Sequence, residues 1–188
     1  MDIGAIILSG GKSSRFGEDK GLYIYKNKPL ITYSIDLCNK FANSILISSN
    51  NLEYKKFGFP VFGDVYKESG PMGGIHAGLS NSKNSINLIV SSDTPFIQEG
   101  LIDLLLKNYD NEDIVIFQTE DSKFQTLIGI FHSRIIKLIE TELSLNHLKM
   151  IQFIKQTNHK IIKLDSNSEF SKSFINFNYQ SDIQRYGD

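Results

Sequence analysis

The chain has 188 residues, of which 40% are hydrophobic and 22% charged, with a formal net charge of −1. A chain of this length can bury about 70% of its unfolded surface, so we expect one self-sufficient domain over residues 1–188. The balanced charge argues against a nucleic-acid partner, and the absence of a membrane span or signal peptide from the sequence pattern predicts a cytoplasmic protein without a membrane partner.

Short apolar segments alternate with helical patterns along the chain. We predict strands at 3–8, 44–48, 60–62, 86–90, 114–117, 127–131, 161–164 and 174–177. We predict helices at 30–41, 74–79, 100–108, 133–143 and 147–156, and a polar surface loop at 165–173. The single cysteine, Cys38, excludes an internal disulfide and lies in an apolar helical pattern, which predicts an inert core thiol.

Alternation of strands and helices requires crossover connections, which give a mainly parallel sheet covered on both faces. The segment 127–131 follows 114–117 too closely for such a crossover, so we predict one antiparallel strand there. The expected fold is therefore α/β, with a mostly parallel, doubly covered sheet.

The loop after the first predicted strand combines glycines with cations. Ser9, Gly10 and Gly11 follow that strand directly, and Arg15 and Lys20 come next. Glycines let the backbone approach a ligand, while free amide groups and cations suit a polyphosphate. We therefore predict a nucleotide triphosphate site here, in preference to a simple glycine turn.

Two common phosphate-loop patterns do not fit this loop. The pattern G-x-x-x-x-G-K-[ST] would need a glycine at Ile6, and G-x-G-x-x-G would need one at Lys12. Neither pattern therefore identifies this loop.

Polar residues also mark the ends of other predicted strands. They are Asn50, Asp64, Asp93, Asn176 and Asn178. Because ligands of open α/β sheets bind outside the carboxyl ends of the strands, we expect one site at one edge of the sheet to collect these side chains.

Asp93 follows a predicted strand, and Pro95 turns the chain away from it. A carboxylate at that position can hold Mg²⁺, which bridges phosphate oxygens. The alternative is an aspartate that caps the next helix. Asp64 can also be interpreted as a ligand, and the alternative is that it belongs to a plain turn.

A second glycine-rich loop, 70–74, precedes a predicted helix. Its exposed backbone groups at Pro71, Gly73 and Gly74 suit recognition of a nucleobase edge, and they also suit close packing. The four histidines lack the spacing of zinc ligands, and nothing places one beside a candidate serine nucleophile.

Taken together, these segments resemble the molybdenum cofactor guanylyltransferases, a family of nucleotidyltransferases with a Rossmann-like sheet. The similar segments are Leu8-Ser9-Gly10-Gly11, Arg15-Phe16-Gly17, Asp19-Lys20-Gly21, Gly70-Pro71-Met72-Gly73-Gly74, Ser91-Ser92-Asp93-Thr94-Pro95 and Asn176-Phe177-Asn178. The resemblance implies transfer of GMP from GTP to molybdopterin with Mg²⁺ and release of pyrophosphate. It also implies molybdopterin and GTP as partners, with other cofactor-biosynthesis proteins or molybdoenzyme chaperones.

The resemblance also implies roles for individual residues. Leu8, Ser9 and Gly10 would line the base and ribose, with Gly11 typical of the guanine-specific branch. Lys20 would contact phosphate, and with Arg15 would stabilise charge on the α-phosphate and on pyrophosphate. Asn50 and Asp64 would assist nucleotide binding, Asp93 would bind nucleotide and Mg²⁺, and Asn176 and Asn178 would lie on the pterin side.

The chain departs from the family at a few positions. Ser9 stands where alanine is common, and Leu148 and Lys149 stand in a segment that is often rich in arginine. Two alternatives stay open at this point. One is a cytidylyltransferase that acts on the same pterin or on a sugar or polyol phosphate, and the other is a non-catalytic nucleotide sensor on the same fold.

Overall fold

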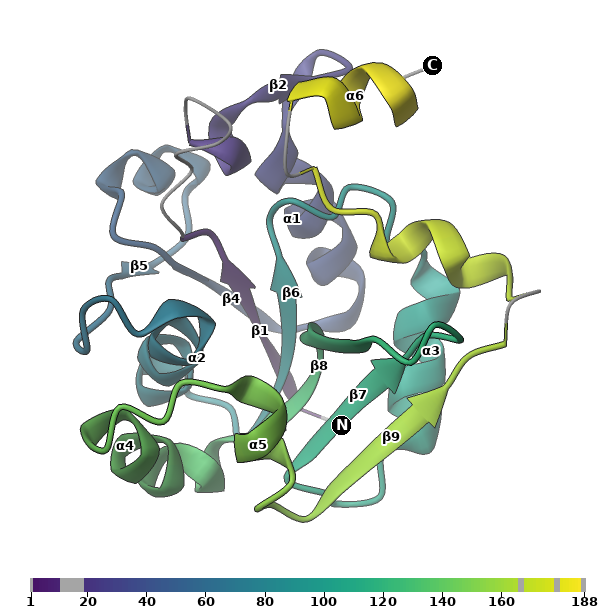
Figure 1. Cartoon of the computed structure of the whole chain (residues 1–188). Coiled ribbons are helices and arrows are strands. Elements are labelled where there is room, and N and C mark those ends of the chain that lie inside the picture. Colours follow the sequence, from purple (N-terminus) through teal and green to yellow (C-terminus); the bar gives the residue numbers. More distant parts are fainter. Residues whose placement is uncertain (1, 11–18, 166–167, 178–179, 187–188) are drawn as a thin grey trace.

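The computed structural model describes residues 2–10, 19–165, 168–177 and 180–186 (Figure 1). Within these ranges a seven-stranded sheet has the order β5-β4-β1-β6-β8-β7-β9. The strands are β1 (Ile3–Leu8), β4 (Ser44–Ser48), β5 (Val61–Phe62), β6 (Ile86–Ser91), β7 (Ile114–Gln118), β8 (Phe124–His132) and β9 (His159–Lys163). Neighbours pair in parallel except β8, which is antiparallel to both β6 and β7. The predicted α/β fold with one antiparallel strand is confirmed.

The remaining elements surround this sheet. A small hairpin pairs β2 (Ile24–Tyr25) with β3 (Lys28–Pro29). The α-helices are α1 (Leu30–Phe41), α2 (Gly70–Asn81), α3 (Glu99–Asn108), α4 (Ile136–Ser144), α5 (Met150–Ile154) and α6 (Gln180–Tyr186). The 3₁₀ helices are η1 (Lys20–Leu22), η2 (Leu52–Phe57), η3 (Ser133–Ile135) and η4 (Glu169–Phe174).

Helices cover both faces of the sheet (Figure 1). Ile7 and Val90 belong to the core on the side of α1 and α3, whereas their neighbours Ile6 and Ile89 belong to the core on the side of α2, α4 and α5. Successive residues of a strand point to opposite faces, so a strand covered on both sides needs apolar or small residues throughout. All six residues of β1 are accordingly buried.

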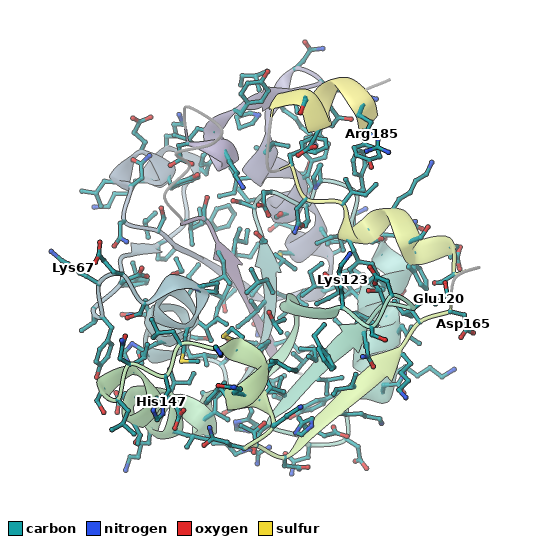
Figure 2. All side chains as sticks on the ribbon, in the orientation of Figure 1. Lys67, Glu120, Lys123, His147, Asp165 and Arg185 are labelled. Carbon is teal, nitrogen blue, oxygen red and sulfur yellow. The ribbon has the colours of Figure 1, made fainter. Side chains whose placement is uncertain are left out.

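Charged side chains lie at the periphery of the molecule (Figure 2). Lys67, Lys123 and Asp165 are exposed there, as are His147 and Arg185. Cys38, in contrast, is fully buried in α1, and burial raises the pKa of its thiol to about 12, as expected of an inert core residue. In the part of the chain that the structure describes, no helix combines the length and apolar character that a bilayer crossing requires.

Most predicted elements are present, with some differences in their bounds. The bounds of α1, β1 and β4 are as predicted. Helix α2 begins at Gly70, so the second glycine-rich segment is the first turn of a helix and not a loop. Helix α5 is shorter at both ends than the predicted 147–156, and before it the backbone N–H of His147 donates to Glu142 O at 2.9 Å.

The predicted strand at 174–177 is wrong. Its apolar residues serve an aromatic cluster, in which the ring of Phe177 lies 5.1 Å from that of Tyr25 and 5.6 Å from that of Phe96, centroid to centroid. The predicted surface loop before it instead contains η4, whose Ser173 is buried and accepts a hydrogen bond from Gln98 N at 3.2 Å. The expectation of one domain over residues 1–188 stays a prediction.

The strand order reverses between β1 and β6. From β1 the chain passes by α1 to β4 and then β5 on one side, and it returns by α2 to β6 on the other side. Such a topological switch point leaves a crevice outside the carboxyl ends of the two central strands. Here Ser92 N donates to Leu8 O at 3.0 Å, so the residues after β1 and β6 lie side by side.

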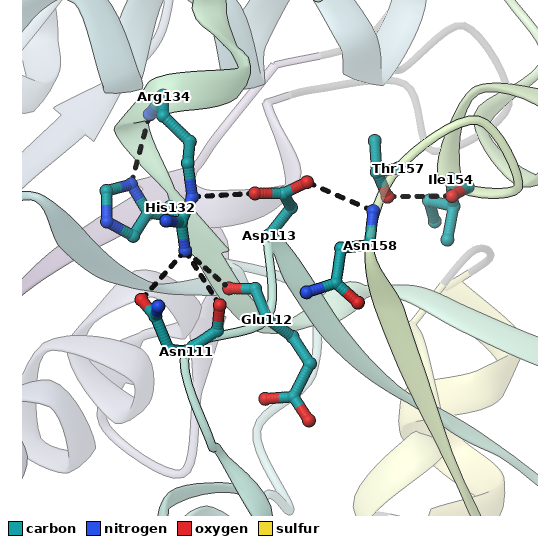
Figure 3. Close-up of polar contacts among 8 residues, drawn as sticks. All are labelled: Asn111, Glu112, Asp113, His132, Arg134, Ile154, Thr157 and Asn158. Carbon is teal, nitrogen blue, oxygen red and sulfur yellow. Dashed lines mark hydrogen bonds and ion pairs between the residues drawn. The ribbon is translucent and has the colours of Figure 1, made fainter.

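At the opposite edge, Arg134 joins the loops that precede β7 and β9 (Figure 3). Its Nε lies 2.6 Å from Asp113 Oδ1, and its guanidinium donates to Asn111 O at 2.8 Å and to Asn111 Oδ1 at 2.9 Å. Asp113 in turn accepts from Asn158 N at 3.0 Å. This network is structural and was not foreseen from the sequence, because its members are far apart along the chain.

We expect Arg134→Ala to lower the free energy of unfolding by about 1–3 kcal/mol, because it leaves Asp113 without its charged partner and frees two acceptors of Asn111. Arg134→Lys should recover only part of this loss, since a lysine cannot reproduce the guanidinium fork. Urea unfolding measures both variants. Equal midpoints for the wild type and the alanine variant would show that the network adds nothing to stability.

Candidate active site

Lys20 and Asp93 lie together although 73 residues separate them in the sequence. Lys20 Nζ is 3.4 Å from Asp93 Oδ2, and the two side chains are 22% and 18% exposed. Asp93 Oδ1 also accepts from Ser91 Oγ at 2.5 Å. The structure therefore places a cation and a carboxylate, both largely shielded from solvent, at the switch point of the sheet.

Asp93 is not a helix cap. The next helix, α3, has Gln98 as its N-cap residue, and no side chain caps it. The backbone oxygen of Asp93 instead accepts from Phe177 N at 3.0 Å, which fixes the C-terminal segment against the site. The capping alternative is thus excluded, and the carboxylate faces Lys20.

The ends of β1, β4 and β6 are joined by hydrogen bonds. Ser9 N donates to Ser48 O at 2.9 Å, and Ser9 Oγ lies 2.9 Å from Ser92 Oγ. All three serines are buried, so these contacts are shielded from water. Ser9 thus has a defined structural partner.

The turn that carries Lys20 packs tightly onto these strand ends. Gly21 is buried, and a Cβ built on it would lie 2.6 Å from Ser9 Oγ and 3.0 Å from Ser92 Oγ. It would lie closer still to the hydroxyl of Tyr54. The glycine is required here by close approach, and this approach brings Lys20 to the edge of β6.

Asp19, just before that turn, accepts three hydrogen bonds through its carboxylate. The donors are Gly21 N at 3.2 Å, Asn51 Nδ2 at 2.9 Å and the hydroxyl of Tyr54. Sequence reasoning missed Asn51 and Tyr54. The only signal for Tyr54 was one aromatic residue among Glu53, Lys55 and Lys56, which is too common a pattern to assign a role.

Asn50 and Asp64 bind one another, from the ends of β4 and β5. Asn50 Nδ2 donates to Asp64 Oδ2 at 3.2 Å, and Asp64 N donates to Asn50 Oδ1 at 2.9 Å. Burial raises the pKa of the Asp64 carboxyl, while the hydrogen bond from Asn50 and the charge of His76 oppose this shift. The pair forms a second polar position along the same edge.

The first turn of α2 faces this pair. Ideal Cβ atoms on Gly73 and Gly74 would lie 3.6 Å and 3.8 Å from carboxyl atoms of Asp64, and one on Gly73 would lie 3.1 Å from Tyr66 O. Close packing therefore accounts for Gly73. The carbonyl of Gly74 accepts from Ser48 Oγ at 2.8 Å, so this acceptor is already engaged.

The other predicted site residues have varied surroundings. Leu8 is buried at the end of β1, an ideal Cβ on Gly10 meets no heavy atom of the described residues within 4 Å, and Pro71 is exposed at the start of α2. Asn176 is exposed beside Phe177. Three predicted site residues lie outside the described residues: Gly11, Arg15 and Asn178.

Leu148 and Lys149 lie between α4 and α5. Leu148 packs partly buried against the core under α2 and α4, and Lys149 is the exposed N-cap residue of α5.

The donor set of the site fits magnesium better than zinc. The described residues contain no cluster of three or more histidine, cysteine, aspartate or glutamate side chains that could hold a metal ion. Mg²⁺, in contrast, is usually held by one or two carboxylates together with substrate phosphates and water. Asp93 is a carboxylate of this kind at the edge of the sheet.

Comparison with known proteins agrees with this geometry. Residues 5–160 match the MobA-like NTP transferase domain. The chain is 33% identical over 171 residues to a "Probable molybdenum cofactor guanylyltransferase" of Flavobacterium johnsoniae, covering 90% of each chain. It is 32% identical over 186 residues to the molybdenum cofactor guanylyltransferase of Vibrio vulnificus, covering 97% of this chain and 93% of that one.

A solved structure shares the fold. The crystal structure of molybdopterin-guanine dinucleotide biosynthesis protein A from Archaeoglobus fulgidus, 18% identical in sequence, has a TM-score of 0.79 over 98% of this chain and 96% of that one. Fold and relatives together define a nucleotidyltransferase. The chain belongs to the MobA-like NTP transferase family, and the resemblance noted in its sequence is confirmed.

We expect Gly21→Ala to destabilise the protein by about 1–3 kcal/mol, because the added methyl group overlaps three hydroxyl groups in a packed site. Gly10→Ala is the matched control, since its methyl group would enter open space. Thermal unfolding without nucleotide measures both. A Gly21 variant as stable as the Gly10 variant would contradict the close approach described here.

Proposed function

We propose that this protein transfers GMP from GTP to the phosphate of molybdopterin, with Mg²⁺, and releases pyrophosphate. The observation that carries the proposal is the Lys20–Asp93 pair at the switch point of a sheet whose family and relatives are nucleotidyltransferases. The names of the Flavobacterium and Vibrio relatives support guanylyl transfer and the molybdenum cofactor as the acceptor.

In this proposal the nucleotide occupies the crevice between the ends of β1 and β6. Leu8, Ser9 and Gly10 line the base and ribose, and Gly11 extends this wall. Gly10 suits such a contact because no heavy atom of the described residues lies within 4 Å of an ideal Cβ on it.

The first turn of α2 contributes the other side of the nucleotide site. Pro71, Gly73 and Gly74 would line the nucleotide here, because Pro71 is exposed and the glycines have no side chain to keep a ligand from the backbone. Asn50 and Asp64 complete this side as a pair, since each holds the other in place.

Asp93 would hold Mg²⁺, with the phosphates of GTP completing the coordination. When bound, the ion would neutralise phosphate charge and so reduce repulsion between nucleotide and acceptor. Asp93 Oδ2 contacts Lys20 in the structure, so in the nucleotide complex the ammonium of Lys20 would turn to the phosphates while the carboxylate of Asp93 holds the cation.

Lys20 and Arg15 would stabilise the negative charge that develops on the α-phosphate and on pyrophosphate. The acceptor needs no general base, because a phosphate monoester has a second pKa of about 6 and is mostly dianionic at neutral pH. The protein therefore has to bring two anions together and align them for in-line attack on the α-phosphorus. Asn176 and Asn178 would lie on the side of the pterin. Phe177, which stands between them in the sequence, donates a backbone hydrogen bond to Asp93 O and so holds this segment at the site.

The test is an assay of pyrophosphate release with a source of molybdopterin and each of the four nucleoside triphosphates, with Mg²⁺ and with EDTA. We expect turnover with GTP, little with CTP, and none after removal of the metal. Preferred use of CTP would favour the cytidylyltransferase alternative. Binding of GTP without release of pyrophosphate would favour a nucleotide sensor.

We expect Lys20→Ala to reduce turnover by a factor of about 10²–10³, because it removes one preorganised cation from the developing charge. Lys107→Ala is the matched control, since Lys107 is exposed in the last turn of α3. Steady-state kinetics measure both. Turnover of the Lys20 variant within about a factor of two of the control would exclude Lys20 from the mechanism.

A further inference from the structure

The carboxylate of Asp19, which directly precedes Lys20, accepts hydrogen bonds from three groups of the protein. Its Oδ1 accepts from Gly21 N at 3.2 Å and from the hydroxyl of Tyr54, and its Oδ2 accepts from Asn51 Nδ2 at 2.9 Å. Both oxygens are thus engaged by donors of the protein. Hydrogen bonds to an ionised acceptor are stronger than those between neutral groups, so this set of contacts holds Asp19 firmly.

Tyr54 is well suited to anchor this carboxylate. It is fully buried in η2, among the largest buried side chains of the molecule. Burial, and next the hydrogen bond with Asp19, raise the pKa of its hydroxyl, so the group keeps its proton and acts as a donor over the whole working range. The ring fixes the position of the hydroxyl, because a packed aromatic side chain has little freedom of movement.

Asn51 completes the anchor from the same segment. Its Nδ2 donates to Asp19 while its Oδ1 caps η2 by accepting from Glu53 N at 3.0 Å. The amide is therefore oriented by one bond and holds Asp19 with the other. Asn51 directly follows Asn50, so the segment after β4 supports two parts of the site at once.

The backbone hydrogen bonds of the turn after Asp19 fix the position of Lys20 relative to Asp19. Leu22 N donates to Asp19 O and Tyr23 N donates to Lys20 O, each at 3.1 Å. Gly21 packs against three hydroxyl groups on the other side of Lys20. The backbone of Lys20 is fixed before and after it, so its flexible side chain reaches Asp93 from a defined origin.

We propose that Tyr54 and Asn51 are positioning residues that act through Asp19 to hold Lys20 against Asp93. This inference rests on the proposed function, because it assigns these residues to the transfer reaction.

The first test is Tyr54→Phe, which removes the hydroxyl and keeps the ring. The matched control is Tyr109→Phe, because the Tyr109 hydroxyl is also buried but has no hydrogen-bond partner among the described residues. We expect kcat to fall about 10-fold in the Tyr54 variant with KM for GTP changed less than about 3-fold, since misplacement of a catalytic group by about 1 Å costs up to 10² in rate. The control should keep the kcat of the wild type.

A double-mutant cycle separates positioning from general damage to the structure. If Tyr54 acts through Lys20, Tyr54→Phe should have no further effect on kcat in a protein that already carries Lys20→Ala. An equal fractional loss of kcat in both backgrounds would overturn the proposal, because the hydroxyl would then act independently of Lys20.

Asn51→Asp tests the second anchor. Aspartate keeps an oxygen that can cap η2 but replaces the donor to Asp19 with a second carboxylate. We expect a loss of kcat at least as large as that of Tyr54→Phe, again absent in the Lys20→Ala background. Wild-type kcat in Asn51→Asp would remove Asn51 from the proposal.

Hydrogen exchange supplies a readout that does not depend on the reaction. Exchange of the amides of Gly21, Leu22 and Tyr23 should accelerate in Tyr54→Phe and not in Tyr109→Phe. Unchanged exchange would overturn the anchor itself. A wild-type protein that releases no pyrophosphate with any nucleotide would instead refute the proposed function, while the exchange result would still decide whether Tyr54 holds this turn.

Discussion

The site depends on the adjacency of two strand ends. Because the chain leaves β1 in one direction and returns to β6 on its other side, the residues that follow these strands become neighbours. The contacts Ser92 N to Leu8 O and Ser9 Oγ to Ser92 Oγ then fasten the two segments to one another. Among the described residues, the polar groups of the candidate site follow strands that these two contacts hold together.

The carboxylates along this edge differ in chemistry because they differ in surroundings. Asp19 is engaged by three donors of the protein and serves the structure. Asp64 is partly buried against α2 and paired with Asn50, a neutral partner. Asp93 faces a lysine and one hydroxyl, so it is the carboxylate best placed to hold a cation.

Hydroxyl groups and glycines do much of the positioning. Ser9, Ser92 and Tyr54 all crowd Gly21, and a larger residue there would push the Lys20 turn away from the sheet. The C-terminal segment is held by a different contact, an aromatic cluster around Phe177 with a backbone bond to Asp93. Distant parts of the chain thus reach one edge through local, short-range contacts.

The sequence by itself determined the periodic elements and the composition of the loops between them. Apolar segments such as Ile3–Leu8 and the amphipathic pattern of Leu30–Phe41 define strands and helices locally, and a strand–helix alternation restricts the topology. The glycines and cations after the first strand, and Asp93 after β6, could therefore be predicted as a nucleotide site, and that assignment stays a prediction. The strand at 174–177 was wrong because an apolar segment can pack its rings into a cluster as well as pair with a sheet.

Only the tertiary structure decided which polar groups face one another. Lys20 meets Asp93, Asn50 meets Asp64, and Tyr54 meets Asp19 across separations of 73, 14 and 35 residues. Such partners depend on the order of the strands and on where a glycine allows another side chain to come close. Neither feature produces a periodic pattern in the sequence. The sequence thus supplied the chemical groups, and the fold assigned their partners, because contacts across a sheet edge are set by topology and not by spacing along the chain.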